Sequence, residues 1–179
     1  RGVKDDLLKI AQKNRDVVTL AQNFLGIKPT INRIEIYANI PKIGDKEEIG
    51  SKMWHRDSQT FLEADLMFAV TNINDENGPF CYITPEDFGS NRYFNPKVHF
   101  GWEGGGRFTT KELIDYGLNP ETINKFIGKS GSYLLLNAGE AYHRGGFCKS
   151  EMRILGRFIY SGFGDKRDNL INYSVSQSY

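Results

Sequence analysis

The sequence predicts a mainly β fold with helices, of α+β character, arranged as an antiparallel sandwich or barrel. Short segments of alternating, β-branched and aromatic residues recur along the chain, as they do in sheet proteins. Helical patterns are confined to the start of the chain and to one insertion, which keeps them at the edges of a sheet. Aromatic residues make up 13% of the chain, and 179 residues suffice for one domain with a sizeable core. We therefore expect a single domain over residues 1–179.

The first element that we expect is a helix over residues 4–25. Its apolar residues fall near helical spacing, Asp5 and Asp6 lie at its start, and Gly26 follows it as a stop. Beyond it the periodicity changes to that of strands. The expected strands cover residues 31–39, 61–74, 80–84, 132–137 and 153–162.

An insertion with helical signals precedes the last two of these strands. Thr109 and Glu112 form a capping-box pattern for one helix. The pair Asn119-Pro120 supplies an N-cap and a first-turn proline for a second short helix, which we expect to end at Gly128. Residues 85–108 are rich in Gly, Asn, Pro and aromatics, which predicts a long loop of the kind that often binds ligands.

Charge and composition narrow the classes of partner. The formal net charge is +1, so the sequence indicates no strong attraction to nucleic acid or to an anionic membrane. Cys81 and Cys148 are isolated, which predicts neither a disulfide framework nor a CxxC metal site. With no signal peptide and no apolar run long enough to span a bilayer, we expect a cytoplasmic protein. Because the chain begins at Arg1, we also expect natural residues before it, and its oligomeric state stays open.

The segment Met53-Trp54-His55-Arg56-Asp57-Ser58 predicts part of a metal site. In a strand, residues two apart face the same side, so His55 and Asp57 would point the same way. The chain offers His99 and His143 as third ligands. His99 lies in the loop-like stretch, whereas His143 follows an apolar strand, so we choose His143. Two histidines and one carboxylate with open coordination positions are typical of non-heme Fe(II) oxygenases.

A His-x-Asp pair taken alone is more often a surface ion pair than a pair of metal ligands. Arg153, ten residues after His143, changes this weighting. It opens the last expected strand, and its guanidinium fork suits a carboxylate. Oxygenases that use 2-oxoglutarate need such a cation for the far end of that co-substrate.

These residues resemble the phytanoyl-CoA dioxygenase family of Fe(II)- and 2-oxoglutarate-dependent oxygenases. The similarity runs from about residue 31 to 163. The segments that carry it are Trp54-His55-Arg56-Asp57, "NINDENGPFCYI" (72–83), "GKSGSYLLLNAGEAYHRGG" (128–146) and Arg153.

The resemblance implies a double-stranded β-helix core, the jelly roll of cupin-like proteins, with the N-terminal helix packed on one side. It implies that iron is held by His55, Asp57 and His143. It further implies that 2-oxoglutarate places its distal carboxylate on Arg153, near Asn39 and Tyr37. With dioxygen, such enzymes hydroxylate an unactivated C–H bond and release succinate and CO2.

The substrate is the least determined part of the site. After the Asn-Gly-Pro turn the chain departs from the usual family pattern and continues Ile83-Thr84-Pro85-Glu86-Asp87, so the entrance loop differs. Relatives that halogenate carry a small residue at the carboxylate position, so Asp57 favours hydroxylation. We expect a small-molecule substrate, and two arginines among the candidate contacts would suit an anionic one. The candidate substrate contacts are Arg56, Gln59, Trp102, Tyr142 and Arg144.

Other kinds of function fit parts of the sequence. The chain could be a non-catalytic ligand-binding jelly roll, or a cupin-type metal enzyme that does not use 2-oxoglutarate. Arg153 disfavours both, because neither needs a carboxylate clamp at that position. A P-loop is excluded, since "GKS" (128–130) is preceded by Ile123 where a glycine is required. Nothing in the sequence orients Cys148 and His143 as a nucleophilic pair.

Overall fold

The structure is a computed structural model that describes residues 3–41, 48–57, 63–84, 86–87, 106–162 and 171–177. Its helices are α1 (Val3–Lys13), α2 (Arg15–Leu25) and α3 (Thr110–Asp115), with two short 3₁₀-helices, η1 (Gly50–Lys52) and η3 (Pro120–Thr122). Its strands are β1 (Thr30–Ile40), β2 (Glu63–Ala69), β3 (Phe80–Ile83), β4 (Asn124–Phe126), β5 (Tyr133–Leu136), β6 (Tyr142–Arg144), β7 (Arg153–Ser161) and β8 (Ile171–Gln177).

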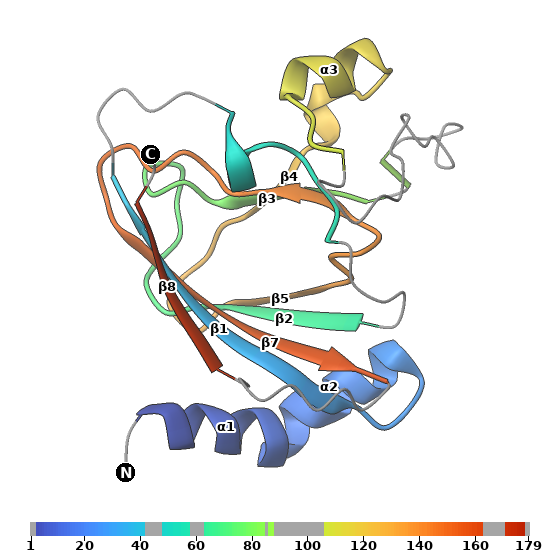
Figure 1. Cartoon of the computed structure of the whole chain (residues 1–179), viewed down its shortest axis with the longest axis vertical. Helices are drawn as coiled ribbons and strands as arrows, with labels where there is room; N and C mark the ends of the chain where they lie inside the picture. The colour runs from blue at the N-terminus through green and yellow to red at the C-terminus, as the bar shows by residue number, and fades with distance from the viewer. Residues whose placement is uncertain are drawn as a thin grey trace.

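The described strands form two facing sheets. The larger sheet has five strands in the order β5-β2-β7-β1-β8, and the smaller has three in the order β4-β3-β6. Figure 1 shows α1 and α2 on the outer side of the larger sheet, and α3 beyond the smaller one. Strand pairing is antiparallel except between β1 and β8, which are parallel. The non-sequential strand order and the two facing sheets are those of a jelly roll.

Alternation along the strands separates three apolar layers. On β7, Phe158 and Tyr160 pack with α1 and α2 on the outer side of the larger sheet. Leu155, which faces the other way, packs between the two sheets against residues such as Phe80. A third cluster, which includes Trp54 and Leu113, fills the space around α3. Because successive side chains point to opposite faces, the even and odd positions of β7 serve different layers.

The single helix expected over residues 4–25 is two helices, and Asn14 separates them. Its backbone is extended (φ −69°, ψ 113°), and its side-chain oxygen accepts hydrogen bonds from the backbone N–H groups of Asp16 and Val17. An asparagine that caps a helix in this way favours a new helix start over continuation. The apolar spacing continues across the break, which hid it in the sequence.

The insertion also differs from its prediction. Thr109 and Glu112 form the expected capping box at the start of α3. Asn119 caps only a 3₁₀ turn, and the chain then enters β4, whose residues pair with β3. The helix predicted to end at Gly128 was therefore wrong, because pairing with β3 overrides the local helix signal. Most of the loop predicted over 85–108 lies outside the described residues.

The predicted fold class is confirmed. The described part of the chain is mainly β, with antiparallel sheets and few helices, and α1 and α2 cover one side of the larger sheet. Strands β6 and β8 were not predicted, and β2 is shorter than the apolar run 61–74 suggested. None of the helices in the described ranges combines the length and the hydrophobicity needed to cross a bilayer.

Strand β2 carries a carboxylate that is fully removed from solvent. Glu63 is 0% exposed, and burial together with the nearby charge of Asp65 raises its pKa from 4.5 to about 7. The folded protein therefore keeps a proton on Glu63 at pH values where the unfolded chain has released it. The resulting contribution to stability is present below about pH 4.5 and is lost as the pH rises through about 7.

Replacing Glu63 by Gln should remove this pH dependence. The wild-type free energy of unfolding should fall between pH 5 and pH 8 more steeply than that of Glu63→Gln, by on the order of 2 kcal/mol. Urea unfolding at the two pH values measures the difference. Glu121→Gln, at an exposed position, should keep the wild-type slope. If Glu63→Gln also keeps that slope, Glu63 has no raised pKa.

Candidate metal centre

Backbone hydrogen bonds bring His55, Asp57 and His143 together from distant parts of the chain. The N–H of His55 donates to the carbonyl of His143 at 3.0 Å, and the N–H of His143 donates back at 2.8 Å. Two residues on, the N–H of Asp57 donates to the carbonyl of Ala138 at 2.9 Å. These bonds fix both segments on which the predicted ligands lie.

The reason given for pairing His55 with Asp57 was wrong, although the two side chains do meet. Residues 53–57 form no named strand, and only Trp54 and His55 make isolated bridges. Trp54 points into the cluster around α3, whereas His55 points the other way, toward His143. Asp57 follows in irregular backbone that Ala138 holds in place.

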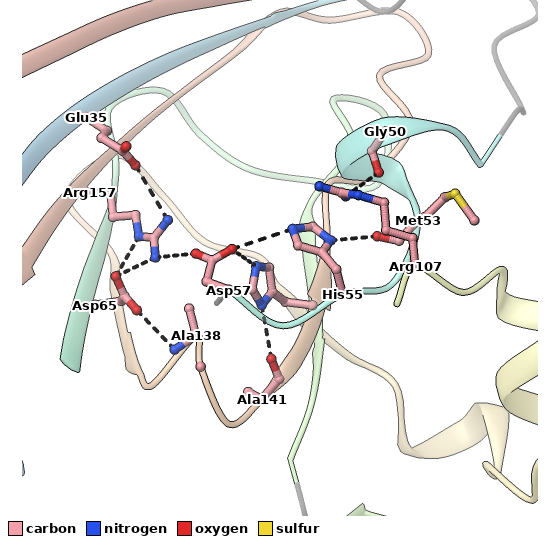
Figure 2. A network of polar contacts seen from close by, with 12 residues as sticks. Glu35, Gly50, Met53, His55, Asp57, Asp65, Arg107, Ala138, Ala141 and Arg157 are labelled. Carbon is pink, nitrogen blue, oxygen red and sulfur yellow. Dashed lines mark hydrogen bonds and ion pairs between the residues drawn. The ribbon is translucent and has the colours of Figure 1, made fainter. Parts of the chain in front are cut away.

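The three side chains present their ligand atoms to one another. Nε2 of His55 lies 3.8 Å from Oδ1 of Asp57, and Nε2 of His143 lies 3.5 Å from the same oxygen. One ligand atom from each residue falls within 4.8 Å of the others. Figure 2 shows the His55 ring and the Asp57 carboxylate turned toward each other. Two histidines and a carboxylate in this arrangement can hold a metal ion and leave coordination positions open.

Backbone carbonyls set the tautomer of both histidines. Nδ1 of His55 lies 2.8 Å from the carbonyl of Met53, and Nδ1 of His143 lies 3.0 Å from that of Ala141. A carbonyl only accepts, so the neutral form of either ring carries its proton on Nδ1 and directs the lone pair of Nε2 toward Asp57. This is how metal-binding histidines are usually oriented.

The charge states suit a divalent cation. Burial lowers the pKa of His55 to about 4, and proximity to His143 adds to the effect, so the ring is neutral at pH 7. Burial alone would raise the pKa of Asp57, but contacts with His143 and Arg157 outweigh it and hold the pKa well below its usual range. The centre thus offers a neutral imidazole and an ionised carboxylate without loss of a proton, and metal ligands must be deprotonated to bind.

Arg157, which sequence reasoning missed, holds the second oxygen of the carboxylate. Its Nη2 donates to Oδ2 of Asp57 at 2.8 Å, and its Nε donates to Oδ1 of Asp65 at 2.6 Å. The sequence did contain a signal: Arg153 and Arg157 are four residues apart on one strand, so both face the same side. In β2, Glu63 and Asp65 are two residues apart, so these two acidic side chains also face one side of their strand.

The ligands line a cavity of about 270 Å³ between the sheets. Residues from β1, β2, β3 and β7 form much of its wall. The lining residues are Tyr37, Asn39, Ser51, His55, Asp57, Met67, Phe80, His143, Gly145, Arg153, Leu155 and Arg157. The cavity therefore contains both the candidate metal ligands and the three residues predicted to hold a co-substrate.

Arg153 is a buried cation on the wall of this cavity. It is 4% exposed, donates to the carbonyl of Gly78, and donates to Oδ1 of Asn39 at 2.9 Å. Its Nε has no hydrogen-bond partner, and among the described residues no carboxylate pairs with it. Burial lowers the pKa of Arg153, because its charge has left water. A buried guanidinium in this state favours the entry of an anion.

Close backbone packing sets the position of the carbonyl that Arg153 contacts. Gly78 adopts a left-handed conformation (φ +71°), and a Cβ on Gly146 would come within 2.3 Å of the carbonyl oxygen of Pro79. Only glycine permits so close an approach. The two glycine-containing motifs that carried the family resemblance thus pack against each other beside Arg153.

Of the other residues predicted to contact the co-substrate or the substrate, some line the cavity and others do not. Tyr37 lines the cavity, but its hydroxyl donates to Glu35. Tyr142 packs into the cluster around α3, and the Arg144 guanidinium stacks 5.1 Å from the centre of the Trp54 ring. Both flank His143 on β6 and so point to its opposite face. Arg56 stacks on Tyr142, and none of these three lines the cavity. Gln59, His99 and Trp102 lie outside the described residues.

Comparisons with known proteins find the fold. No family model matches the sequence, and neither does any curated protein. Among solved structures, the non-heme α-ketoglutarate-dependent epimerase SnoN from nogalamycin biosynthesis is similar over 88% of this chain and 58% of its own, with a TM-score of 0.61 and 16% identity. EctD from S. alaskensis, solved with bound Fe, is similar over 87% of this chain and 52% of its own, with a TM-score of 0.59 and 16% identity. AviO1 from Streptomyces viridochromogenes Tue57 covers 89% and 61%, with a TM-score of 0.56 and 11% identity.

This chain spans between half and two thirds of the length of these structures. At such low sequence identity the likeness is one of fold, and the narrower assignment to the phytanoyl-CoA dioxygenase family stays a prediction. The described part of the chain therefore has the jelly-roll fold that it shares with a non-heme α-ketoglutarate-dependent epimerase and with an iron-bound protein.

Proposed function

We propose that the protein is an Fe(II)- and 2-oxoglutarate-dependent dioxygenase. His55, Asp57 and His143 would hold the iron, and Arg153 would receive the distal carboxylate of 2-oxoglutarate. The reaction would hydroxylate an unactivated C–H bond of a small molecule and release succinate and CO2.

One observation carries this proposal: a single cavity contains one site that favours a cation and another that favours an anion. At the metal centre, two imidazole Nε2 atoms and a carboxylate oxygen face one another, an arrangement that favours a cation. Arg153 lines the same cavity, is buried, and has no carboxylate partner among the residues that the structure describes, an arrangement that favours an anion. 2-Oxoglutarate fits both sites, because its oxo-acid end can chelate a metal ion while its other carboxylate is free to pair with an arginine.

The chain's own residues would prepare the cavity for this chemistry. Iron with 2-oxoglutarate and dioxygen supplies the oxidant that attacks a C–H bond. Met67, Phe80 and Leu155 give the cavity apolar walls, which keep bulk water from the reacting atoms. The Asn39 side-chain oxygen fixes the Arg153 guanidinium, so the cation is oriented before a carboxylate arrives.

The comparisons support this class of reaction but leave its outcome open. An α-ketoglutarate-dependent epimerase and an iron-bound protein share the fold. Epimerisation and hydroxylation can both begin with removal of hydrogen from carbon, so the fold alone favours neither. Asp57 favours hydroxylation over halogenation, because its carboxylate occupies the position that a halide would need.

Metal binding provides the first test. Metal-free protein titrated anaerobically with Fe(II) should bind about one equivalent, and 2-oxoglutarate should then produce a weak visible charge-transfer band. His143→Ala should lose the band because one of three ligands is gone, and Asp57→Ala should lose succinate production coupled to hydroxylation. His99→Ala, which removes the alternative histidine, should behave as the wild type.

Each failure of this titration indicates a different protein. Iron binding without a 2-oxoglutarate band would indicate a cupin-type metal enzyme. An absence of iron binding would favour a non-catalytic ligand-binding jelly roll. Loss of the band in His99→Ala and its retention in His143→Ala would mean that His99, and not His143, is the third ligand.

Binding of 2-oxoglutarate should depend on Arg153 separately from the metal. Arg153→Met should lower the affinity for 2-oxoglutarate about 10- to 100-fold, which is the loss expected for a hydrogen bond to a charged group. The affinity for Fe(II) should change little. Arg153→Lys should recover part of the affinity, because it keeps the charge but not the fork. The charge-transfer band at increasing 2-oxoglutarate measures both variants.

Arg33→Met provides the control, since Arg33 pairs with Glu35 and does not line the cavity. Its 2-oxoglutarate affinity should equal that of the wild type. Unchanged affinity in Arg153→Met would mean that the carboxylate binds elsewhere.

A further inference from the structure

The buried Arg157 side chain contacts three carboxylates at once. Besides its hydrogen bonds to Asp57 and Asp65, its Nη1 lies 3.5 Å from Oε2 of Glu35. Arg157 is 7% exposed and Asp65 is 0% exposed, so these charges interact with little screening by water. Figure 2 shows the Arg157 guanidinium between the three acidic side chains, with Asp57 on the side that faces His55.

The contacts between Arg157 and Asp57 belong to a closed circuit. The Ala138 N–H donates to Oδ2 of Asp65 at 3.0 Å, and the Ala138 carbonyl accepts from the Asp57 N–H at 2.9 Å. Asp65 in turn accepts from Arg157, whose other nitrogen donates to the Asp57 side chain. The backbone of one residue, Ala138, and the guanidinium of Arg157 thus fix both the backbone and the carboxylate of Asp57.

In this circuit the two carboxylate oxygens of Asp57 have different partners. Oδ2 of Asp57 accepts from Arg157, while Oδ1 faces Nε2 of His55 and of His143. Rotation of the carboxylate would break the bond to Arg157 and leave a buried cation with fewer partners, which is unfavourable. Only one oxygen is therefore presented to the point where the histidines converge.

The remaining carboxylate ties the circuit to β1. Glu35 accepts from the Tyr37 hydroxyl and pairs with Arg33 Nε at 2.9 Å. Glu35 lies opposite Arg157 in the register of β1 and β7, as Asn39 lies opposite Arg153. The two arginines that face the cavity are thus each held from the same neighbouring strand.

We propose that Arg157 is a positioning residue of the metal centre, held by Asp65, which restricts Asp57 to a single ligand oxygen. The inference rests on the metal centre of the proposed function, though not on the identity of the co-substrate. A carboxylate that binds through one oxygen leaves a coordination position that a two-oxygen carboxylate would occupy. The circuit would thereby preserve room for a chelating co-substrate. Partners of this kind typically contribute 10- to 100-fold to metal affinity.

The test is a titration of the metal-free protein with Co(II), whose visible absorption reports the number and geometry of its ligands. Arg157→Met should lower Co(II) affinity about 10- to 100-fold and change the absorption band. Arg157→Lys should recover part of the affinity. Asp65→Asn should also weaken binding, and the double variant Asp65→Asn/Arg157→Met should be no worse than Arg157→Met, because both substitutions break one circuit.

Lys125→Met is the control, since Lys125 pairs with Asp75 at the surface and contacts none of the residues of the circuit. It should keep the wild-type affinity and spectrum. Far-UV circular dichroism reports folding, and if Arg157→Met does not fold, Arg157→Lys and Asp65→Asn decide the question.

Two outcomes would overturn the inference, and they are distinguishable. If the wild type binds Co(II) and the folded Arg157 and Asp65 variants match it within about twofold with the same spectrum, the positioning role is wrong while the metal centre stands. If the wild type binds neither Co(II) nor Fe(II), the metal centre and the inference fail together.

Discussion

The paired backbone hydrogen bonds between His55 and His143 are the contact on which the candidate site depends. They join a segment that precedes β2 to the last strand of the smaller sheet. They also fix the facing of both segments, so that Trp54 enters the cluster around α3 while His55 enters the cavity. A shift of either segment by one residue would turn its histidine away from the cavity, because side chains alternate between faces.

The larger sheet separates its polar and apolar functions by face. Its outer side is apolar and packs on α1 and α2, whereas its inner side carries Glu35, Asp65, Arg153 and Arg157. Buried charges are costly unless they are paired, and pairing around Arg157 offsets much of that cost. Arg153 is the exception, since no carboxylate among the described residues pairs with it. The two arginines of β7 therefore differ, since Arg157 belongs to an ion network and Arg153 does not.

The sequence predicted the fold class well because strand alternation and turn residues are local signals. It predicted the meeting of His55, Asp57 and His143 for a partly wrong reason, since residues 53–57 form no named strand. It did not reveal that β6 turns Tyr142 and Arg144 away from the cavity, because a three-residue strand is too short to show a period. The role of Arg157 was hidden for another reason: its partners come from three separate segments, and their proximity depends on strand order.

The long separations within the site have a consequence for how the protein is made. Arg153 contacts Asn39 across 114 residues, and Arg157 contacts Asp57 across 100 and Asp65 across 92. Contacts of such high order form slowly, since the loops between them must close first. During synthesis Arg157 can reach the Asp57 carboxylate only after β7 has emerged. Capture of a metal by the complete centre should therefore follow the folding of the sheets and not guide it.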